Sequence, residues 1–148
     1  MNFVVEKDPG MIPKVLAQIL DSCINGVALS DPDLPDNPLV YVNEVFLRMT
    51  GYAREEVLGR NCRFLQGDDR EQPALEEIRA ALAQSRPVEV TLRNYRKDGT
   101  LFYNRLRIRP LLDSAGRVIY HLGVQYDVTD QVEAQHEIAR LNALLDPS

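Results

Sequence analysis

The Asp98-Gly99 pair constrains the fold of this chain more than any other feature, because it joins two stretches in which apolar residues alternate with polar ones. Residues 88–96 precede the turn and residues 101–109 follow it. An Asp-Gly turn between alternating stretches is a strong signal for an antiparallel β-hairpin. We therefore predict two paired strands whose successive side chains point to opposite faces of a sheet.

Each predicted strand carries one asparagine on its otherwise apolar face. The first face holds Val88, Val90, Leu92 and Asn94, and the second holds Phe102, Asn104, Leu106 and Ile108. A buried amide has to be hydrogen-bonded. Two interpretations remain open: the amides bind each other or the backbone, or they bind a polar heterocycle in the core.

The remaining pattern predicts an α+β fold with a five-stranded antiparallel sheet, short helices on one face and a flanking helix at each end. Asn43 is expected to begin one short helix as its cap, and Gly51 to end it. The expected helices are a segment after Pro13 that ends near residues 22–26, then 44–50, 54–58, 70–85 and 130–146; the other expected strands are 27–29, 39–42 and 118–128.

The last expected strand has one wholly apolar face, formed by its even-numbered residues from Val118 to Val128. His121, Gly123 and Gln125 lie on the opposite face. If Gln125 faces the core, the apolar face points outward and needs a cover. The two terminal helices are the candidates, the second beginning with a capping box at Asp130 and packing on the sheet or on a second subunit.

Composition indicates one soluble domain with extensions. The chain has 148 residues, of which 45% are hydrophobic and 26% charged. It has no apolar run of transmembrane length and no signal peptide in Met1 to Pro9, so we expect a cytoplasmic protein that does not enter a membrane. The net charge of -5 disfavours nucleic-acid binding. Neither the two cysteines nor His121 and His136 form a cluster with metal-ligand spacing, so no metal is expected.

The segment from Gly59 to Gln66 concentrates polar chemistry. Cys62 lies between Asn61 and Arg63, so a thiol stands beside an amide and a guanidinium. Arginine offers a fixed set of donors that matches phosphate, and the amides offer both donors and acceptors. The segment could therefore form a wall for a planar, anionic cofactor, although an isolated cysteine is usually only a small hydrophobic residue.

Arg79 falls on the apolar face of the expected helix 70–85, four residues after Leu75 and three before Leu82. A buried guanidinium without a partner is costly. Either its aliphatic part lies along apolar surface while its charged end reaches water, or an anion binds it.

The chain resembles the light-oxygen-voltage (LOV) photosensors of the PAS superfamily over roughly residues 25 to 130. The matching motifs are Asp31-Pro32, Leu34 to Pro38, Thr50-Gly51-Tyr52, Gly59 to Gln66, Asn94-Tyr95, Lys97-Asp98-Gly99, Asn104 and Gly123-Val124-Gln125. The resemblance implies an N-terminal helical cap over 1–24, a LOV core over 25–129 and a C-terminal helix over 130–148.

In that family the cysteine matching Cys62 forms a light-driven bond to carbon C4a of FMN. The resemblance implies that Arg63 and Arg79 bind the FMN phosphate, and that Gln125 faces flavin O4 and N5. Arg70 is either a further phosphate ligand or a surface residue. Asn61 and Gln66 would contact the flavin and ribityl chain, Asn94 and Asn104 the pyrimidine edge, and Leu106 and Gly123 are the other expected cofactor contacts. A surface pair of Lys97 with Glu55 or Glu56 is also implied.

The resemblance implies a blue-light sensor rather than an enzyme. About twenty residues follow the core, too few for a fused effector, so we expect a homodimer that signals through its N-terminal and C-terminal helices to an effector in trans. A flavin-binding redox sensor or small flavoenzyme and a PAS module used only for dimerisation are the alternatives. The colour of the protein, and its bleaching by blue light, would separate the three.

Overall fold

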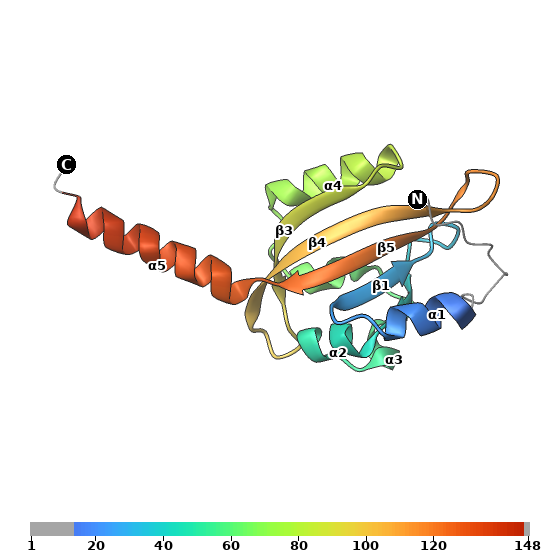
Figure 1. The fold of residues 1–148 in the computed structure, drawn as a ribbon, viewed down its shortest axis with the longest axis horizontal. Helices are drawn as coiled ribbons and strands as arrows, with labels where there is room; N and C mark the ends of the chain where they lie inside the picture. Colours follow the sequence, from blue (N-terminus) through green and yellow to red (C-terminus); the bar gives the residue numbers. More distant parts are fainter. Residues whose placement is uncertain (1–13, 147–148) are drawn as a thin grey trace.

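The computed structural model describes residues 14–146, which form one five-stranded antiparallel sheet with helices on both faces (Figure 1). Strand order across the sheet is β2-β1-β5-β4-β3. The strands are β1 (Gly26–Ser30), β2 (Leu39–Val42), β3 (Val88–Tyr95), β4 (Leu101–Leu112) and β5 (Val118–Asp127). The helices are α1 (Lys14–Asp21), α2 (Glu44–Thr50), α3 (Arg54–Val57), the 3-10 helix η1 (Cys62–Gln66), α4 (Pro73–Ala83) and α5 (Thr129–Leu145). The predicted fold class is confirmed.

The predicted hairpin forms between β3 and β4. Gly99 adopts a φ of 88°, a left-handed conformation that glycine enters without steric cost. Leu92 pairs with Asn104, and Asn94 pairs with Phe102. The two asparagines therefore lie on neighbouring strands and on the same face, as the alternation predicted.

Short helices cover one face of the sheet, and α1 covers part of the other. Ala28 packs with the α2 residue Phe46, whereas the neighbouring strand residues Val27 and Leu29 pack with Leu16 of α1. Because successive strand residues point to opposite faces, α1 and α2 lie on opposite sides of the sheet.

Asn43 joins three elements. Its Oδ1 accepts from Phe46 N (3.0 Å), which caps α2 as predicted, and from Val27 N (2.9 Å). Its Nδ2 donates to Asn25 O (2.9 Å) and to Leu20 O (3.4 Å) at the end of α1. One buried amide therefore fixes the start of α2, the start of β1 and the end of α1.

Only one terminal helix covers the last strand. Leu16 and Leu20 of α1 are buried against Tyr120, with Leu122 packed beside them. In contrast, α5 projects from the end of β5 (Figure 1), has no buried residue, and meets the sheet where His136 contacts Tyr103. Along most of its length, therefore, α5 does not pack on its own sheet, and packing on a second subunit stays a prediction.

The predicted capping box at Asp130 is wrong. Helix α5 begins one residue earlier, and Thr129 places its backbone N–H (3.1 Å) and its hydroxyl (2.5 Å) on Asp127 Oδ1. The last residue of β5 therefore supplies the carboxylate at the helix start, which leaves Asp130 inside the first turn.

The predicted division into segments 1–24, 25–129 and 130–148 stays a prediction, and the first thirteen residues of the N-terminal cap lie outside the described residues. Within residues 14–146, no helix has the length and apolar character needed to cross a bilayer.

Candidate functional site

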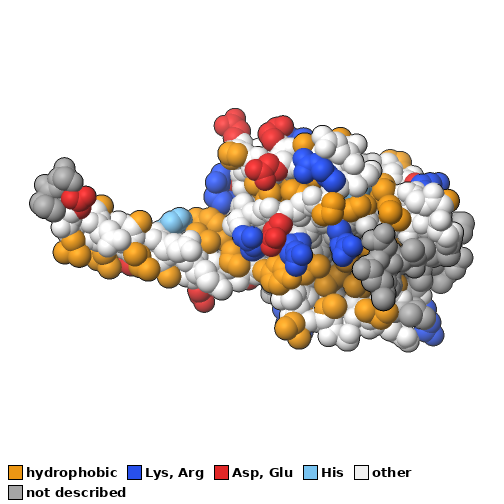
Figure 2. Space-filling view, turned by 45° about the horizontal axis from the view of Figure 1, so that its top comes forward, with side chains coloured by type: hydrophobic (Ala, Val, Ile, Leu, Met, Phe, Trp, Pro, Cys, Tyr) orange, Lys and Arg blue, Asp and Glu red, His pale blue; other side chains and the backbone are white. Residues whose placement is uncertain are grey.

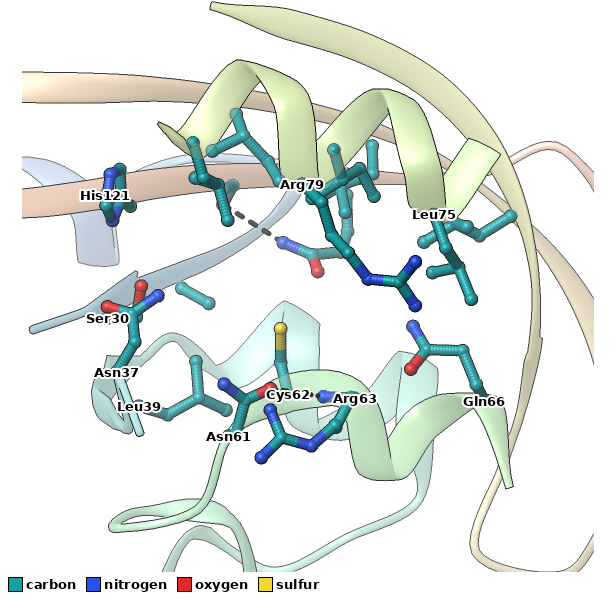
Figure 3. A pocket seen from close by; sticks show the side chains of 18 of the residues that line it. Ser30, Asn37, Leu39, Asn61, Cys62, Arg63, Gln66, Leu75, Arg79 and His121 are labelled. Atoms are coloured by element: carbon teal, nitrogen blue, oxygen red, sulfur yellow. Dashed lines mark hydrogen bonds between the residues drawn. The ribbon is translucent and has the colours of Figure 1, made fainter. Parts of the chain in front are cut away.

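A cavity of about 240 Å³ lies between the sheet and the short helices (Figure 3). Its floor comes from β1, β3, β4 and β5, and its opposite wall comes from η1, α4 and the loop before β2. Nine of the eleven residues predicted for the site line it: Asn61, Cys62, Arg63, Gln66, Arg70, Arg79, Leu106, Gly123 and Gln125. Residues more than 60 positions apart in the sequence therefore meet at one site.

Cys62 begins η1 and points its thiol into the cavity (Figure 3). Asn61 caps this turn, because its Oδ1 accepts from Arg63 N (2.9 Å) while its Nδ2 donates to Asp36 O (2.7 Å). Asn61 thus holds the segment that presents the thiol.

Burial raises the pKa of the Cys62 thiol, and the nearby charge of Arg63 lowers it only in part. The thiol packs against the apolar cluster that includes Phe46 and Leu65. A raised thiol pKa keeps the sulfur protonated at neutral pH. Cys62 therefore carries its own proton into any reaction in the cavity.

Three arginines stand along the helical wall. Arg63 forms an ion pair with Asp36, and Arg79 forms one with Glu76 on the same helix. Arg70 donates from Nε to Gly67 O at 3.0 Å. The Arg79 side chain is 63% exposed, so its charged end reaches water while the residue still lines the cavity. All three guanidiniums remain accessible to an anion.

The loop from Asp31 to Pro38 carries two consecutive residues with left-handed backbone, Asp36 (φ 67°) and Asn37 (φ 49°). Aspartate and asparagine tolerate this conformation better than other residues with a side chain. The turn places Asp36 against Arg63 and lets Asn37 line the cavity.

Asn94 and Asn104 do not line the cavity, but both are buried beside it. Asn104 Nδ2 donates to Asn94 Oδ1 at 3.0 Å, so the amides do bind each other. The Oδ1 of Asn104 nevertheless has no hydrogen-bond donor among the described residues. A buried carbonyl oxygen in this condition requires a donor, and a heterocyclic N–H is one.

Gln125 lines the cavity, and its partner on the neighbouring strand is a glycine, which leaves room for the Gln125 side chain. Gly26 pairs with Gln125, and a Cβ at Gly26 would lie 3.1 Å from the Gln125 Cβ and 3.3 Å from the Met49 methyl carbon. Gln125 is buried and donates from Nε2 to Gly123 O at 3.0 Å. Its amide can exchange this backbone contact for another partner in the cavity.

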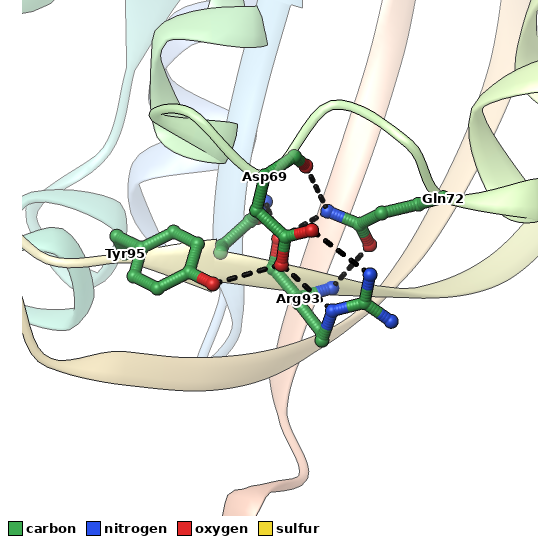
Figure 4. A network of polar contacts seen from close by, with 5 residues as sticks. Asp69, Gln72, Arg93 and Tyr95 are labelled. Atoms are coloured by element: carbon green, nitrogen blue, oxygen red, sulfur yellow. Dashed lines mark hydrogen bonds and ion pairs between the residues drawn. The ribbon is translucent and has the colours of Figure 1, made fainter.

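A polar network fixes the helical wall to the sheet (Figure 4). Asp69, between η1 and α4, accepts two bonds from Arg93 of β3 (2.7 and 2.9 Å) and one from the Tyr95 hydroxyl (2.8 Å). Gln72 binds the backbone of both Asp69 and Arg93. The hydrogen bonds from Arg93 and Tyr95 lower the pKa of Asp69 to about 2.

Several residues that line the cavity were not predicted from the sequence. Ser30, Asn37 and His121 line one end, and apolar residues of α4 including Leu75 line another (Figure 3). Strand alternation already placed His121 on the same face as Gly123 and Gln125, and this pattern could have identified His121 as a cavity residue.

The predicted surface pair is confirmed with Glu56, whose Oε2 lies 2.8 Å from Lys97 Nζ. No cluster of three metal-ligand side chains occurs within residues 14–146.

Comparison with known proteins identifies the family. The family model described as a PAS domain matches residues 24–130. A solved light-oxygen-voltage domain from a study of a flavin analogue is 43% identical and superimposes with a TM-score of 0.75, covering 87% of this chain and 96% of that one. The chain belongs to the LOV domains of the PAS family. An RNA-binding light-oxygen-voltage receptor is 37% identical with a TM-score of 0.80, covering 96% of this chain and 41% of the other.

A curated relative is the blue-light photoreceptor of Listeria monocytogenes, which is 43% identical over 126 residues. The alignment covers 85% of this chain and 49% of the Listeria protein, so the chain spans about half of that relative.

Proposed function

We propose that this LOV domain binds FMN and senses blue light by forming a reversible bond between Cys62 and flavin carbon C4a. The observation that carries the proposal is the position of the Cys62 thiol, which points into the cavity (Figure 3). Gly123 and Gln125 of the sheet line the same cavity. A single nucleophile thus faces the space where a planar ring would lie.

The residues present fit a flavin. Neutral amides can match the acceptors and the N–H of a pyrimidine edge, and the Asn104 Oδ1 needs a donor. Leu92 and Leu106 supply apolar surface for the ring. The exposed guanidiniums of Arg63 and Arg79 can exchange their carboxylate partners for a phosphate dianion, which binds arginine through charge-assisted hydrogen bonds. Two such arginines favour FMN over riboflavin.

When bound and excited by light, the flavin would supply an electrophilic carbon for the sulfur and a nitrogen for the thiol proton. Cys62 supplies both the sulfur and the proton, because its raised pKa keeps the thiol protonated. Asn61 holds the turn that aims the thiol. Gln125 would hold the ring nitrogen, because its amide can offer an N–H to an acceptor and, after turning over, an oxygen to a donor.

The signal is proposed to leave through the terminal helices at a homodimer interface and to reach an effector. The exposed apolar side chains of α5, namely Ile138, Leu141, Leu144 and Leu145, have no cover within residues 14–146, and Figure 2 shows apolar surface along this helix. A stripe of this kind is stabilised by a second helix. Deleting residues 130–148 should weaken dimerisation measured by light scattering, and a full-length protein that is monomeric in dark and light would contradict the interface.

The decisive experiment is an absorbance spectrum of the purified protein before and after blue light, with chromatography of the released cofactor. We expect a yellow protein that contains FMN, bleaches in light and recovers in the dark. A yellow protein that does not bleach would favour a redox sensor or flavoenzyme, and a colourless protein that also fails to take up added FMN would favour a dimerisation module.

A further inference from the structure

One end of the cavity gathers polar side chains that the proposed photochemistry does not use. Ser30 of β1, Asn37 of the loop before β2 and His121 of β5 line this end (Figure 3). Ser30 and His121 are partners across the two strands, and a backbone hydrogen bond from Asp31 N to Pro38 O (3.0 Å) holds the loop beside them. We call Ser30, Asn37 and His121 the polar end.

Two buried atoms of the polar end, Asn37 Oδ1 and His121 Nδ1, have no hydrogen-bond partner among residues 14–146. Buried polar atoms normally have a partner. A water molecule that donates to both atoms and accepts from the Ser30 hydroxyl would make the three hydrogen bonds that are typical of buried water. The polar end is therefore suited to hold one ordered water inside the cavity.

His121 is a neutral base in the cavity that contains the Cys62 thiol. Burial lowers the pKa of His121 below its ordinary value, so the imidazole is uncharged at neutral pH. With its proton on Nε2, the imidazole offers the lone pair of Nδ1 to the water. A group of this kind accepts a proton efficiently, because its pKa lies near the working pH.

The groups that face His121 from the neighbouring elements leave it neutral. The other two residues of the polar end are uncharged, and the partner of His121 on β4 is Pro110. From α4, Arg79 lines the cavity, but it is paired with Glu76 and points away from His121, toward Gln66 (Figure 3). Burial is therefore what sets the protonation of His121.

Strand β5 places the polar end within one water of the Gln125 amide. His121, Gly123 and Gln125 line the same cavity, and Gly123 has no side chain to separate the other two. The Gln125 amide folds back over Gly123, because its Nε2 donates to Gly123 O at 3.0 Å and would lie 3.4 Å from a Cβ at Gly123. From Gly123 to His121 the strand rises about 6.6 Å. One water with two hydrogen bonds of about 2.8 Å each bridges such a gap.

We propose that His121, acting through a water held at the polar end, is the internal base that ends the light state of Cys62. The proposal rests on the bond between Cys62 and flavin C4a proposed above. His121 accepts the proton of the ring nitrogen through the water, and the electron pair of that N–H bond restores the double bond from the nitrogen to C4a. The Cys62 sulfur leaves C4a with the electron pair of the S–C bond, and the imidazolium returns the proton to the sulfur.

The kinetic test is the rate of dark recovery of the full-length, FMN-loaded protein between pH 5 and pH 9. The rate should fall as the pH drops through the pKa of His121, because an imidazolium cannot accept a proton. His121→Gln keeps a polar side chain without a base, so its recovery at pH 8 should be at least about tenfold slower and should lose this pH dependence, since a general base contributes about 10²–10⁴-fold. His136→Gln replaces the other of the two histidines and should recover like the unmodified protein.

A second measurement does not depend on the photochemistry. In His136→Gln, His121 is the one remaining histidine, so an NMR titration reads its pKa and tautomer directly in the flavin-free and in the FMN-loaded, dark protein. We expect a pKa below the ordinary value of about 6.5 and an unprotonated Nδ1 at neutral pH in both samples.

The outcomes separate this proposal from the proposed function. A flavin-loaded protein that does not bleach in blue light overturns both. If the protein bleaches and recovers but His121→Gln recovers at the unmodified rate, only the role of His121 is overturned. Slower recovery of His121→Gln with an unchanged pH profile would overturn it as well, because it marks a purely structural effect. So would an imidazole that stays protonated at neutral pH, because it has no lone pair to offer.

Discussion

The helical wall of the pocket carries a thiol and three arginines, whereas the sheet wall presents the neutral amide of Gln125, with the amides of Asn94 and Asn104 buried beside the cavity. Arg63, Arg70 and Arg79 are exposed, while Asn94, Asn104 and Gln125 are buried. Burying an unpaired charge is far more costly than burying a hydrogen-bonded amide. Under the proposed function, charge recognition and reactivity therefore belong to the helical wall, and recognition of an uncharged ring and transmission of its change belong to the sheet wall.

Removing the thiol tests whether reactivity lies only on the helical wall. Cys62→Ala should retain the flavin and abolish reversible bleaching completely, because alanine offers no nucleophile and the thiol contributes little to binding. Absorbance under blue light measures the effect. Cys23→Ala is the matched control and should bleach as the unmodified protein does; bleaching that persists in Cys62→Ala would place the nucleophile elsewhere.

Removing the charge of Arg79 tests whether the helical wall recognises the phosphate. Arg79→Ala should weaken FMN binding by about tenfold, since a hydrogen bond to a charged group contributes about 1.5–3 kcal/mol and about 1.4 kcal/mol is a factor of ten. Riboflavin binding should not change, because riboflavin has no phosphate. Arg70→Ala should have the same effect more weakly if it reaches the phosphate. Equal losses for FMN and riboflavin would show that Arg79 only supports the helix.

Gln125→Leu tests transmission by the sheet wall. The variant should still form the adduct, because Cys62 is intact, but light should change the hydrogen exchange of α1 and α5 less than in the unmodified protein. Leucine has a similar size and cannot exchange donor for acceptor. A light-induced change of undiminished size would exclude this residue as the switch.

Substitution of Asp69 tests whether its polar network holds the two walls together. A carboxyl whose folded pKa is lowered stabilises the fold above its unfolded pKa of about 3.9, and this contribution disappears as the pH falls through the folded value of about 2. Asp69→Asn should therefore lower the melting temperature at neutral pH and reduce its fall between pH 4 and pH 2. Asp68→Asn, one residue away and exposed, should do neither. Identical melting curves for the two variants would exclude a stabilising role for the network.

Local patterns predicted the sheet well, because strand alternation and an Asp-Gly turn act over a few residues. The hairpin of β3 and β4 and the cap at Asn43 are of this kind. The start of α5 was mispredicted because Thr129 and Asp130 are both acceptable near a helix start, and the choice depends on the carboxylate of Asp127 at the end of β5.

Contacts between residues far apart in the sequence could not be predicted from local sequence patterns. The binding of Asp69 to Arg93 spans 24 positions, and the pair of Arg63 with Asp36 depends on two consecutive left-handed residues in a loop. The choice between mutual pairing of Asn94 and Asn104 and recognition of a ring also needed coordinates. The structure shows that mutual pairing leaves the Asn104 Oδ1 without a donor among residues 14–146, so the two interpretations are compatible.

The antiparallel pairing of β1 with β5 places the entrance and the exit of the chain at one corner of the sheet. Gly26, where the chain enters after α1, lies directly opposite Gln125, and α5 begins only four residues after Gln125. The amide of Asn43 extends the connection from Val27 back to α1. For protein engineering, this means that the points at which the two terminal helices join the sheet are neighbours, and both lie beside the side chain of Gln125.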